Sequence, residues 1–323
     1  MKSIIFITLA LSVFEQPHQN DRQWLSYKDR FNKQYPTKQE EIIRYKNFKL
    51  KDDMINMHND KYSKGQATYK MGHNQFSDMS QEEFKEIYLQ SMKGIPRVPE
   101  RIVNITRPAI PDEITYQDYC MPPLDQGNCG SCWAFASTAQ VEAQLKRRDP
   151  NYNTYISPQY IMDCSGAGSC EGGVPEQALT FLKTNGFSAL SDYKYDGQDE
   201  QCKNDVKKMN AEISSTEHDQ LNGNEDDLAS YVANHGPVVV SLFAPDSLSH
   251  YTEGIFSEDS CPNDCRDVNH AMVVVGYGSS ELDYWLVKNS WSSSWGEDGY
   301  VKMIRNSDNK CNIACGIDFA SVK

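Results

Sequence analysis

The cysteines of this chain are very unevenly distributed, and their distribution constrains the fold more than any other feature. All ten lie between Cys120 and Cys315, so residues 1–119 contain none. Cysteine-rich proteins of the secretory pathway generally oxidise their cysteines to disulfides. The sequence therefore predicts a cysteine-free N-terminal module followed by a disulfide-bonded module.

The first residues predict a secretory signal peptide at 1–16. A positive charge at Lys2 precedes an apolar run from Ile4 to Phe14, which is too short to span a bilayer. A buried strand is the alternative interpretation. The glycosylation sequon at residues 104–106 also fits secretion. No later segment approaches transmembrane length, so we expect no membrane partner.

Composition excludes several other classes of protein. Charged residues make up 24% of the chain and hydrophobic residues 39%, which is typical of a folded globular protein. The net charge of −13 is spread along the chain, and no basic run offers itself to phosphates. We therefore expect no nucleic-acid partner, and we interpret the acidity as favouring solubility in an acidic or crowded compartment.

The two modules differ in their periodicity. Residues 21–88 are polar and charged, with Ile42, Phe48 and Ile55 at helical spacing, which predicts an amphipathic helix packed on another element. Prolines in residues 94–111 predict an exposed, extended stretch that suits cleavage by a processing protease.

The cysteine-containing module combines a helix with later strands. We expect a helix over 131–146, then strands rich in β-branched and aromatic residues over 238–242, 271–275 and 284–287. This order predicts an α+β arrangement of two packed halves, and a cleft between two halves is a usual place for an active site.

The block from Gln126 to Phe135 is the strongest local signal for chemistry. Cys132 follows two glycines and should begin a helix, whose free amides and dipole favour the thiolate that attacks a carbonyl carbon. Gln126 can supply an amide donor to the developing oxyanion, together with the backbone amide of Cys132. The alternatives are a Cys129/Cys132 redox pair or half of a zinc site, although close cysteine pairs in a secreted chain more often form disulfides.

Three blocks in order resemble the papain and cathepsin L family. They are the cysteine block, the strand block at 269–278, and the loop blocks at 288–291 and 295–300. The resemblance implies a papain-like two-domain fold, with a helical half, a β-barrel-like half and an active-site cleft between them. It also implies a cysteine endopeptidase that needs no cofactor or metal and is made as an inactive zymogen.

The resemblance assigns catalytic roles to residues in these blocks. His270 begins an apolar run, so it should stand at the end of a buried strand and pair as imidazolium with the Cys132 thiolate, leading to a thioester acyl-enzyme. The other six histidines lie in polar stretches, for which solvent exposure is the default. Asn289 should orient the His270 ring, and Trp291 should cover that bond or simply pack in the core. Ser292 replaces a glycine of the family.

The N-terminal module resembles an inhibitory propeptide of the same family. Five of six positions of one spaced helical pattern match, with Lys51 replacing an asparagine, and four positions match a second pattern. The matching residues are Glu40, Arg44, Phe48, Ile55 and Asn59, then Gly72, Asn74, Phe76 and Asp78. We expect a small helical propeptide at 17–108, whose extended tail runs through the cleft, and a mature enzyme at 109–323 that begins somewhere from Ile105 to Asp112. We expect acid to release the propeptide through loss of carboxylate contacts.

The resemblance also implies disulfides and a substrate site. It pairs Cys129 with Cys170 and Cys164 with Cys202, and joins Cys265 or Cys261 to Cys311. It leaves Cys120, Cys315 and the other of Cys261/Cys265 unassigned. Gly172 and Gly173 should let an extended peptide approach. Uncharged residues should line the pocket for the substrate side chain two places before the cut (P2) and favour a hydrophobic residue there: Pro175, Ser241, Val268, Ala271 and Gly316.

Expected partners are protein or peptide substrates, the chain's own propeptide and cystatin-type inhibitors, and we expect a monomer. The compartment should be a lysosome or acidic vacuole, or the extracellular space. Two other functions remain open: a binding protein on an inactive protease scaffold, and a different cysteine-dependent acyl transferase. The combination of Gln126, Cys132, His270 and Asn289 argues against the first, and the propeptide and cleft glycines argue against the second.

Overall fold

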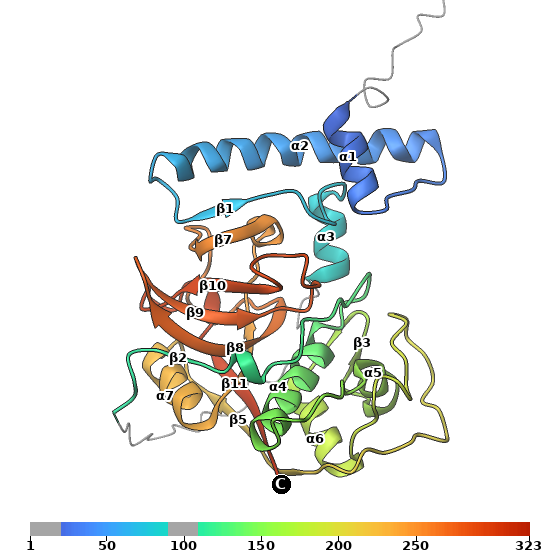
Figure 1. The fold of residues 1–323 in the computed structure, drawn as a ribbon, viewed down its shortest axis with the longest axis vertical. Helices are drawn as coiled ribbons and strands as arrows, with labels where there is room; N and C mark the ends of the chain where they lie inside the picture. The colour runs from blue at the N-terminus through green and yellow to red at the C-terminus, as the bar shows by residue number, and fades with distance from the viewer. Residues whose placement is uncertain (1–20, 90–108) are drawn as a thin grey trace, which may run out of the picture.

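The computed structural model describes residues 21–89 and 109–323 (Figure 1). The expected signal peptide, the sequon and the stretch at 94–108 lie outside the described residues. The N-terminal module consists of helices α1 (Arg22–Arg30), α2 (Lys38–Ser63) and α3 (Gln81–Tyr88) and strand β1 (Tyr69–Met71). Each helix begins after a residue whose side chain accepts backbone N–H bonds: Asp21, Thr37 and Ser80.

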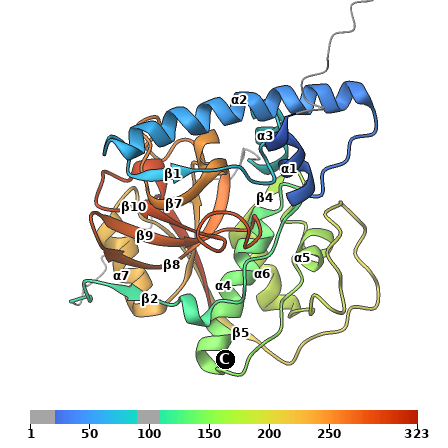
Figure 2. The ribbon, with the colours of Figure 1, turned by 45° about the horizontal axis from the view of Figure 1, so that its top comes forward.

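The amphipathic helix predicted around Phe48 is α2, which runs across one end of the molecule with β1 beneath it (Figures 1 and 2). Phe48 packs with Trp24 and Tyr27 in a small aromatic core of this module. Ile55 instead joins the large core that the module shares with the β-rich half. The N-terminal module is therefore anchored through its own core and through the core of the β-rich half.

The helical half of the cysteine-containing module is built on α4 (Cys132–Arg148), which lies close to the predicted 131–146. Its other elements are α5 (Pro158–Ser165), β3 (Gly168–Ser169), β4 (Gly172–Gly173) and α6 (Pro175–Asn185), preceded by β2 (Ile114–Thr115) and the 3-10 turn η2 (Gln117–Tyr119). Nearly all of the first four turns of α4 is buried, so this helix is the centre of the half that carries Cys132.

The other half is mainly sheet. Its elements are β5 (Ile213–Gln220), α7 (Glu225–His235), β6 (Val238–Leu242), η3 (Asp246–His250), β7 (Tyr251–Phe256), β8 (His270–Ser279), β9 (Asp283–Lys288), β10 (Tyr300–Ile304), η4 (Lys310–Asn312) and β11 (Gly316–Val322). The strands predicted at 238–242, 271–275 and 284–287 are found in β6, β8 and β9.

The sheet follows the order β1-β7-β10-β9-β8-β6-β11-β5, and β2 pairs with β8. This path is open, so the expected barrel-like half is not a closed barrel in the described part of the chain. At one end, β1 of the N-terminal module pairs antiparallel with β7, with Tyr69 opposite Gly254. The N-terminal module thus adds a strand to the sheet of the cysteine-containing module, a docking mode in which main-chain hydrogen bonds hold the added segment.

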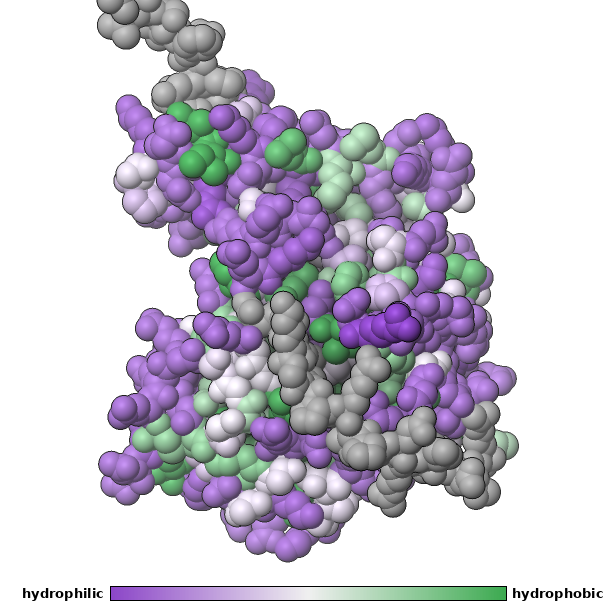
Figure 3. Space-filling model, turned by 180° about the vertical axis from the view of Figure 1, so that it is seen from behind, coloured by the Kyte–Doolittle hydropathy of each residue, from purple (hydrophilic) through white to green (hydrophobic). Residues whose placement is uncertain are grey.

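The surface drawn in Figure 3 is dominated by hydrophilic residues, with small, separated apolar patches. In residues 21–89 and 109–323, no helix combines the length and hydropathy needed to cross a membrane.

Candidate active site

Cys132 is the first residue of α4, as the sequence predicted. The loop before it is anchored by the Cys129–Cys170 disulfide, and Gly127 takes a positive φ of 58°, which favours glycine. Amide groups of Cys132, Trp133 and Ala271 act on the thiol and lower its pKa, but burial outweighs them and raises the pKa to about 11. Burial thus favours the neutral thiol over the thiolate in this form.

His270 is the first residue of β8, and its side chain is fully buried. Its Nε2 lies 2.9 Å from the Asn289 side-chain oxygen, which also accepts the Ser290 amide at 2.8 Å. Because that oxygen can only accept, Nε2 carries the hydrogen, and Nδ1 of the neutral ring is left as the acceptor. Burial lowers the pKa of His270 to about 4, so the ring is neutral in this form. Burial of both groups therefore disfavours the predicted thiolate–imidazolium pair in this form.

Trp291 covers the bond between His270 and Asn289. Its ring centroid lies 4.8 Å from that of His270 at an interplanar angle of 30°, and its side chain is fully buried. Ser292, which follows it, has a positive φ of 70°, a conformation that favours glycine. This backbone requirement explains why the family has a glycine where this chain has serine.

Gln126 is buried and held from several sides. Its side-chain amide nitrogen donates to the Cys129 carbonyl at 2.9 Å, and its side-chain oxygen accepts from the Ser290 hydroxyl at 2.8 Å. Its backbone amide donates to the Ser290 carbonyl at 2.9 Å. Ser290, which sequence reasoning missed, thus fixes the orientation of the amide and connects it to the neighbouring Asn289.

The two cleft glycines form β4, and each of the two positions requires glycine for a different structural reason. Gly172 has a positive φ of 110°. A Cβ on Gly173 would lie 2.4 Å from the Trp133 ring and 2.8 Å from the Ala167 carbonyl oxygen, so any side chain there would force these groups to move. Only glycine fits at position 173 without such movement.

A cavity of about 150 Å³ lies beside β4, where the P2 pocket was expected. Pro175, Ser241, Val268 and Gly316 line it as predicted, whereas Ala271 does not and instead faces Cys132 through its amide. Charged residues that the prediction omitted also line this cavity: Glu176, His218, Arg266 and Asp318. The lining of this cavity therefore combines the expected uncharged residues with charged ones.

The charged wall arises from strand register. Asp318 of β11 lies directly opposite His218 of β5, and their side chains form an ion pair at 2.6 Å. The hydrogen bond to Asp318 raises the pKa of His218. Sequence reasoning could not find this pair because its members are 100 positions apart and neither belongs to a recognised motif.

Four disulfides occur in the described structure. Cys129–Cys170 and Cys164–Cys202 are those implied by the resemblance. Cys261, not Cys265, pairs with Cys311, while Cys265 pairs with Cys315. Each of these last two bonds joins residues 50 positions apart, because two loops run alongside one another in register. The free cysteines are Cys120 and Cys132, and because Cys129 is oxidised with Cys170, it forms neither a redox pair nor a zinc site with Cys132.

The propeptide closes over Trp291. The rings of Phe76 and Phe84 lie edge-on to it at centroid distances of 5.5 Å, and the Gln75 side chain donates to its backbone carbonyl at 2.8 Å. The Tyr88 hydroxyl donates to Asn128, within the loop that precedes Cys132, at 2.9 Å. The propeptide therefore contacts both the loop that precedes Cys132 and the loop that follows Asn289.

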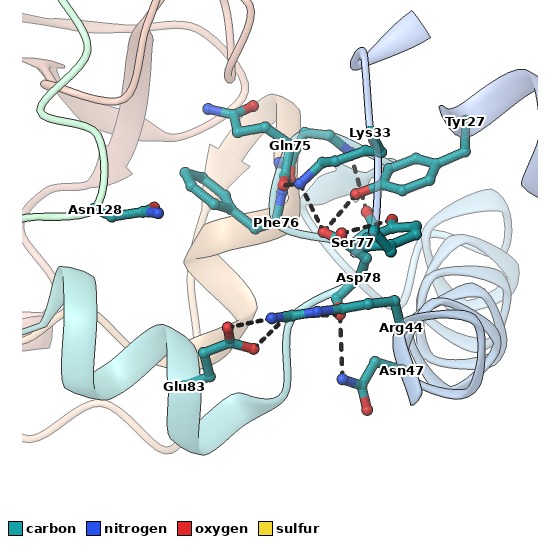
Figure 4. A network of polar contacts seen from close by, with 12 residues as sticks. Tyr27, Lys33, Arg44, Asn47, Gln75, Phe76, Ser77, Asp78, Glu83 and Asn128 are labelled. Carbon is teal, nitrogen blue, oxygen red and sulfur yellow. Dashed lines mark hydrogen bonds and ion pairs between the residues drawn. The ribbon is translucent and has the colours of Figure 1, made fainter. Parts of the chain in front are cut away.

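The motif residues of the propeptide hold its elements together (Figure 4). The buried Asp78 carboxylate accepts from Tyr27, Lys33 and Tyr35 at 2.7–2.8 Å. Arg44 of α2 forms ion pairs with Glu40 at 2.7 Å and with Glu83 of α3 at 2.5 Å. These bonds tie α1, α2 and α3 into one unit.

Two other motif residues attach the chain around β1 to its surroundings. The Asn59 side chain both donates to and accepts from the backbone of Met71 at 2.9 Å. The Asn74 side chain donates to the Ser249 carbonyl of the enzyme at 2.5 Å.

The motif positions at Gly72 and Lys51 also face the enzyme. A Cβ on Gly72 would lie 2.8 Å from Thr252, which explains the glycine. Lys51, at the substituted motif position, pairs with Asp246 of the enzyme at 2.8 Å.

Two family models match the chain: "Papain family cysteine protease" over residues 110–320, and "Cathepsin propeptide inhibitor domain (I29)" over residues 24–84. Cathepsin L of Sarcophaga peregrina is 34% identical, and the match covers 100% of both chains. Cathepsin S of Bos taurus is 35% identical over 91% of this chain and 90% of the relative. Among solved structures, digestive procathepsin L2 proteinase from Tenebrio molitor larval midgut superimposes with a TM-score of 0.83 at 33% identity, covering 93% of this chain and 98% of the other.

Proposed function

This chain belongs to the papain family of cysteine proteases, and on that premise we propose that its catalytic group is Cys132 with His270, Asn289 and Gln126. The observation that carries the proposal is the bond from His270 to Asn289 at the start of β8, where the next residue, Ala271, contacts the Cys132 sulfur. This arrangement fixes the tautomer that leaves Nδ1 free to exchange a proton with the thiol.

The reaction follows from these atoms. The Cys132 thiolate attacks the substrate carbonyl carbon, and the amides of Gln126 and Cys132 stabilise the resulting oxyanion. The His270 imidazolium gives its proton to the amine as the C–N bond breaks, which leaves a thioester on the sulfur. The neutral ring then takes a proton from water, whose oxygen attacks the thioester and displaces the sulfur. An active-site epoxide should label Cys132 stoichiometrically, and failure to label or to cleave a peptide would favour an inactive scaffold.

The proenzyme organisation supports a signal peptide at 1–16, a propeptide at 17–108 and a mature enzyme at 109–323. The matched ranges, 24–84 and 110–320, lie within the two larger segments. We expect purified precursor to mature on acidification, with a new N-terminus between Ile105 and Asp112 by N-terminal sequencing. Equal rates of maturation at neutral and acidic pH would contradict acid activation.

We propose that the cavity beside β4 is the P2 pocket and favours an apolar side chain. Pro175 and Val268 supply apolar wall, and His218, whose pKa its bond to Asp318 raises, offsets the charge of that carboxylate when protonated. A phenylalanine-arginine or leucine-arginine reporter should be cleaved faster than an arginine-arginine reporter. Gly172 and Gly173 would support the substrate backbone, and Trp291 would lie beside it once the propeptide has left.

The remaining expectations concern the surroundings of the enzyme. We propose a secretory-pathway endopeptidase of a lysosome, an acidic vacuole or the extracellular space, acting as a monomer on proteins and peptides. Cystatin-type inhibitors should bind the mature cleft. Titration of the mature enzyme with a cystatin, together with its mass in solution, tests both points, and a product analysis that finds acyl transfer in place of hydrolysis would identify the alternative enzyme class.

A further inference from the structure

The hydroxyl of Tyr195 connects two residues of the loop that carries the nucleophile. Its oxygen lies 2.5 Å from the Gln126 carbonyl oxygen and 2.7 Å from the Ser131 hydroxyl. A carbonyl can only accept, so Tyr195 donates its single proton to Gln126 and accepts from Ser131. Burial raises the pKa of Tyr195, so the phenol retains this proton. The ring packs edge-on against Phe135 of α4 at 4.8 Å.

Ser131 is the residue before α4, where a serine side chain normally accepts an N–H of the first helical turn. Here it makes no such capping bond, and the amides of Ala134 and Phe135 bond to its carbonyl instead. Because the hydroxyl is directed to Tyr195, the amides of Cys132 and Trp133 are left to act on the sulfur. The Tyr195 contact therefore affects the start of the helix that carries the nucleophile.

Gln126 is held from opposite sides. Ser290, in the β-rich half, binds its side-chain oxygen and its backbone amide. Tyr195, in the chain between α6 and β5, binds its backbone carbonyl. Tyr195 thus fixes the main chain of Gln126 relative to the beginning of α4, where the second oxyanion donor, the Cys132 amide, is located.

We propose that Tyr195 is a positioning residue, whose hydroxyl holds Gln126 and Ser131 so that the amides of Gln126 and Cys132 converge on the same substrate oxygen. The inference rests on the proposed oxyanion role of Gln126. Preorganised donors stabilise the transition state more than the bound substrate, so loss of Tyr195 should act on kcat more than on KM.

The test uses Tyr195→Phe, made as the full-length precursor and then matured. Tyr193→Phe is the matched control, because Tyr193 lies two positions away and its hydroxyl binds Asp163 at 2.6 Å, outside the oxyanion site. Loss of an oxyanion donor elsewhere costs about 10²–10³ in kcat, and a displaced donor should cost less, so we expect about a tenfold fall in kcat for Tyr195→Phe. KM should change by less than about twofold, and Tyr193→Phe should retain wild-type kcat.

A second measurement separates positioning from general damage. A peptide aldehyde adds to the sulfur and places an anionic oxygen at the oxyanion site, so its affinity should fall in proportion to kcat/KM. Alkylation of Cys132 by iodoacetamide needs no oxyanion donor and should stay within about twofold of wild type. Ser131→Ala should lower kcat less than Tyr195→Phe, and the double variant should be no slower than Tyr195→Phe alone.

The outcomes are distinct. Unchanged kcat and aldehyde affinity in Tyr195→Phe, with a Gln126→Ala variant strongly impaired, overturns the role of Tyr195 and leaves the proposed function intact. An unimpaired Gln126→Ala variant overturns the proposed oxyanion role of Gln126 and, with it, the role of Tyr195. A Tyr195→Phe variant whose alkylation rate falls as much as kcat also overturns the inference, because the thiol itself would then be disturbed.

Discussion

His270 in the catalytic site and His250 in η3 are both fully buried, yet the protein supports them differently. Asn289 binds the His270 ring, whereas neither ring nitrogen of His250 has a hydrogen-bond partner among the described residues. Burial lowers the pKa of His270 to about 4 and that of His250 to about 3. Burial therefore acts on one ring that Asn289 of the enzyme orients and on one whose surroundings include Gly72 of the propeptide.

Residues of the propeptide surround His250. The His250 carbonyl accepts from Gly72 of the propeptide at 2.9 Å. Lys51 and His73, also of the propeptide, further lower the pKa of the ring. Lys51 is paired with Asp246 at 2.8 Å and His73 with Asp52 at 3.1 Å. The comparison teaches that the support of His270 belongs to the enzyme and survives maturation, while the surroundings of His250 include the propeptide and change when it leaves.

The largest expected effect separates the roles of the two histidines. His270→Ala should lower kcat/KM by at least about 10⁴, because removing one member of a catalytic unit costs nearly as much as removing the whole unit. His250→Phe should leave kcat/KM of the matured enzyme near wild type. Both variants are matured with a trace of active protease and assayed on a peptide reporter; equal losses in the two would remove the distinction.

The second prediction concerns pH. His250 has a pKa of about 3 beneath the propeptide against an ordinary value of about 6.5, so the closed proenzyme is stabilised above pH 6.5 and loses that contribution as pH falls towards 3. The ratio of the wild-type maturation rate to that of His250→Phe should rise by up to about tenfold per pH unit below pH 6.5. His235→Phe, at an exposed position of α7, is the control. A ratio that does not change with pH would falsify this role.

A third variant loosens the propeptide without touching either histidine. Asp78→Ala removes three hydrogen bonds and leaves the Lys33 ammonium without its carboxylate, which should destabilise the propeptide by about 3 kcal/mol. We expect unprocessed precursor to show protease activity at neutral pH. Asp60→Ala, which removes only an exposed ion pair with Lys64, should remain latent. Latency in both variants would contradict the structural role of Asp78.

The smallest effect should come from Lys51→Met. It removes a positive charge beside His250 and frees the Asp246 carboxylate, and both changes favour a protonated ring. The acid response of maturation should therefore begin at a higher pH, by less than about one unit. Maturation rates across a pH series measure this shift, and a shift to lower pH would show that Lys51 does not act on His250.

Sequence reasoning succeeded where function depends on short motifs. The position of Cys132 at a helix start, His270 at the start of a strand and the paired motif positions of the propeptide all follow from local patterns. The expectation that histidines in polar stretches are exposed is wrong for His250. Its burial depends on β1 and α2, which lie far from it in the sequence. The pairing of Cys265 with Cys315 and the facing of His218 and Asp318 depend likewise on long-range register.

The most direct test of the account is the alkylation rate of Cys132 against pH in precursor and matured enzyme, with the labelled cysteine identified by mass mapping because Cys120 is also free. In the precursor the thiol pKa of about 11 should keep alkylation slow at neutral pH and make it rise towards alkaline pH. In the matured enzyme His270 should support a thiolate, so that alkylation at pH 7 is at least about 100-fold faster and persists into acidic pH. Equal rates in the two forms would contradict a buried, neutral Cys132 thiol in the precursor.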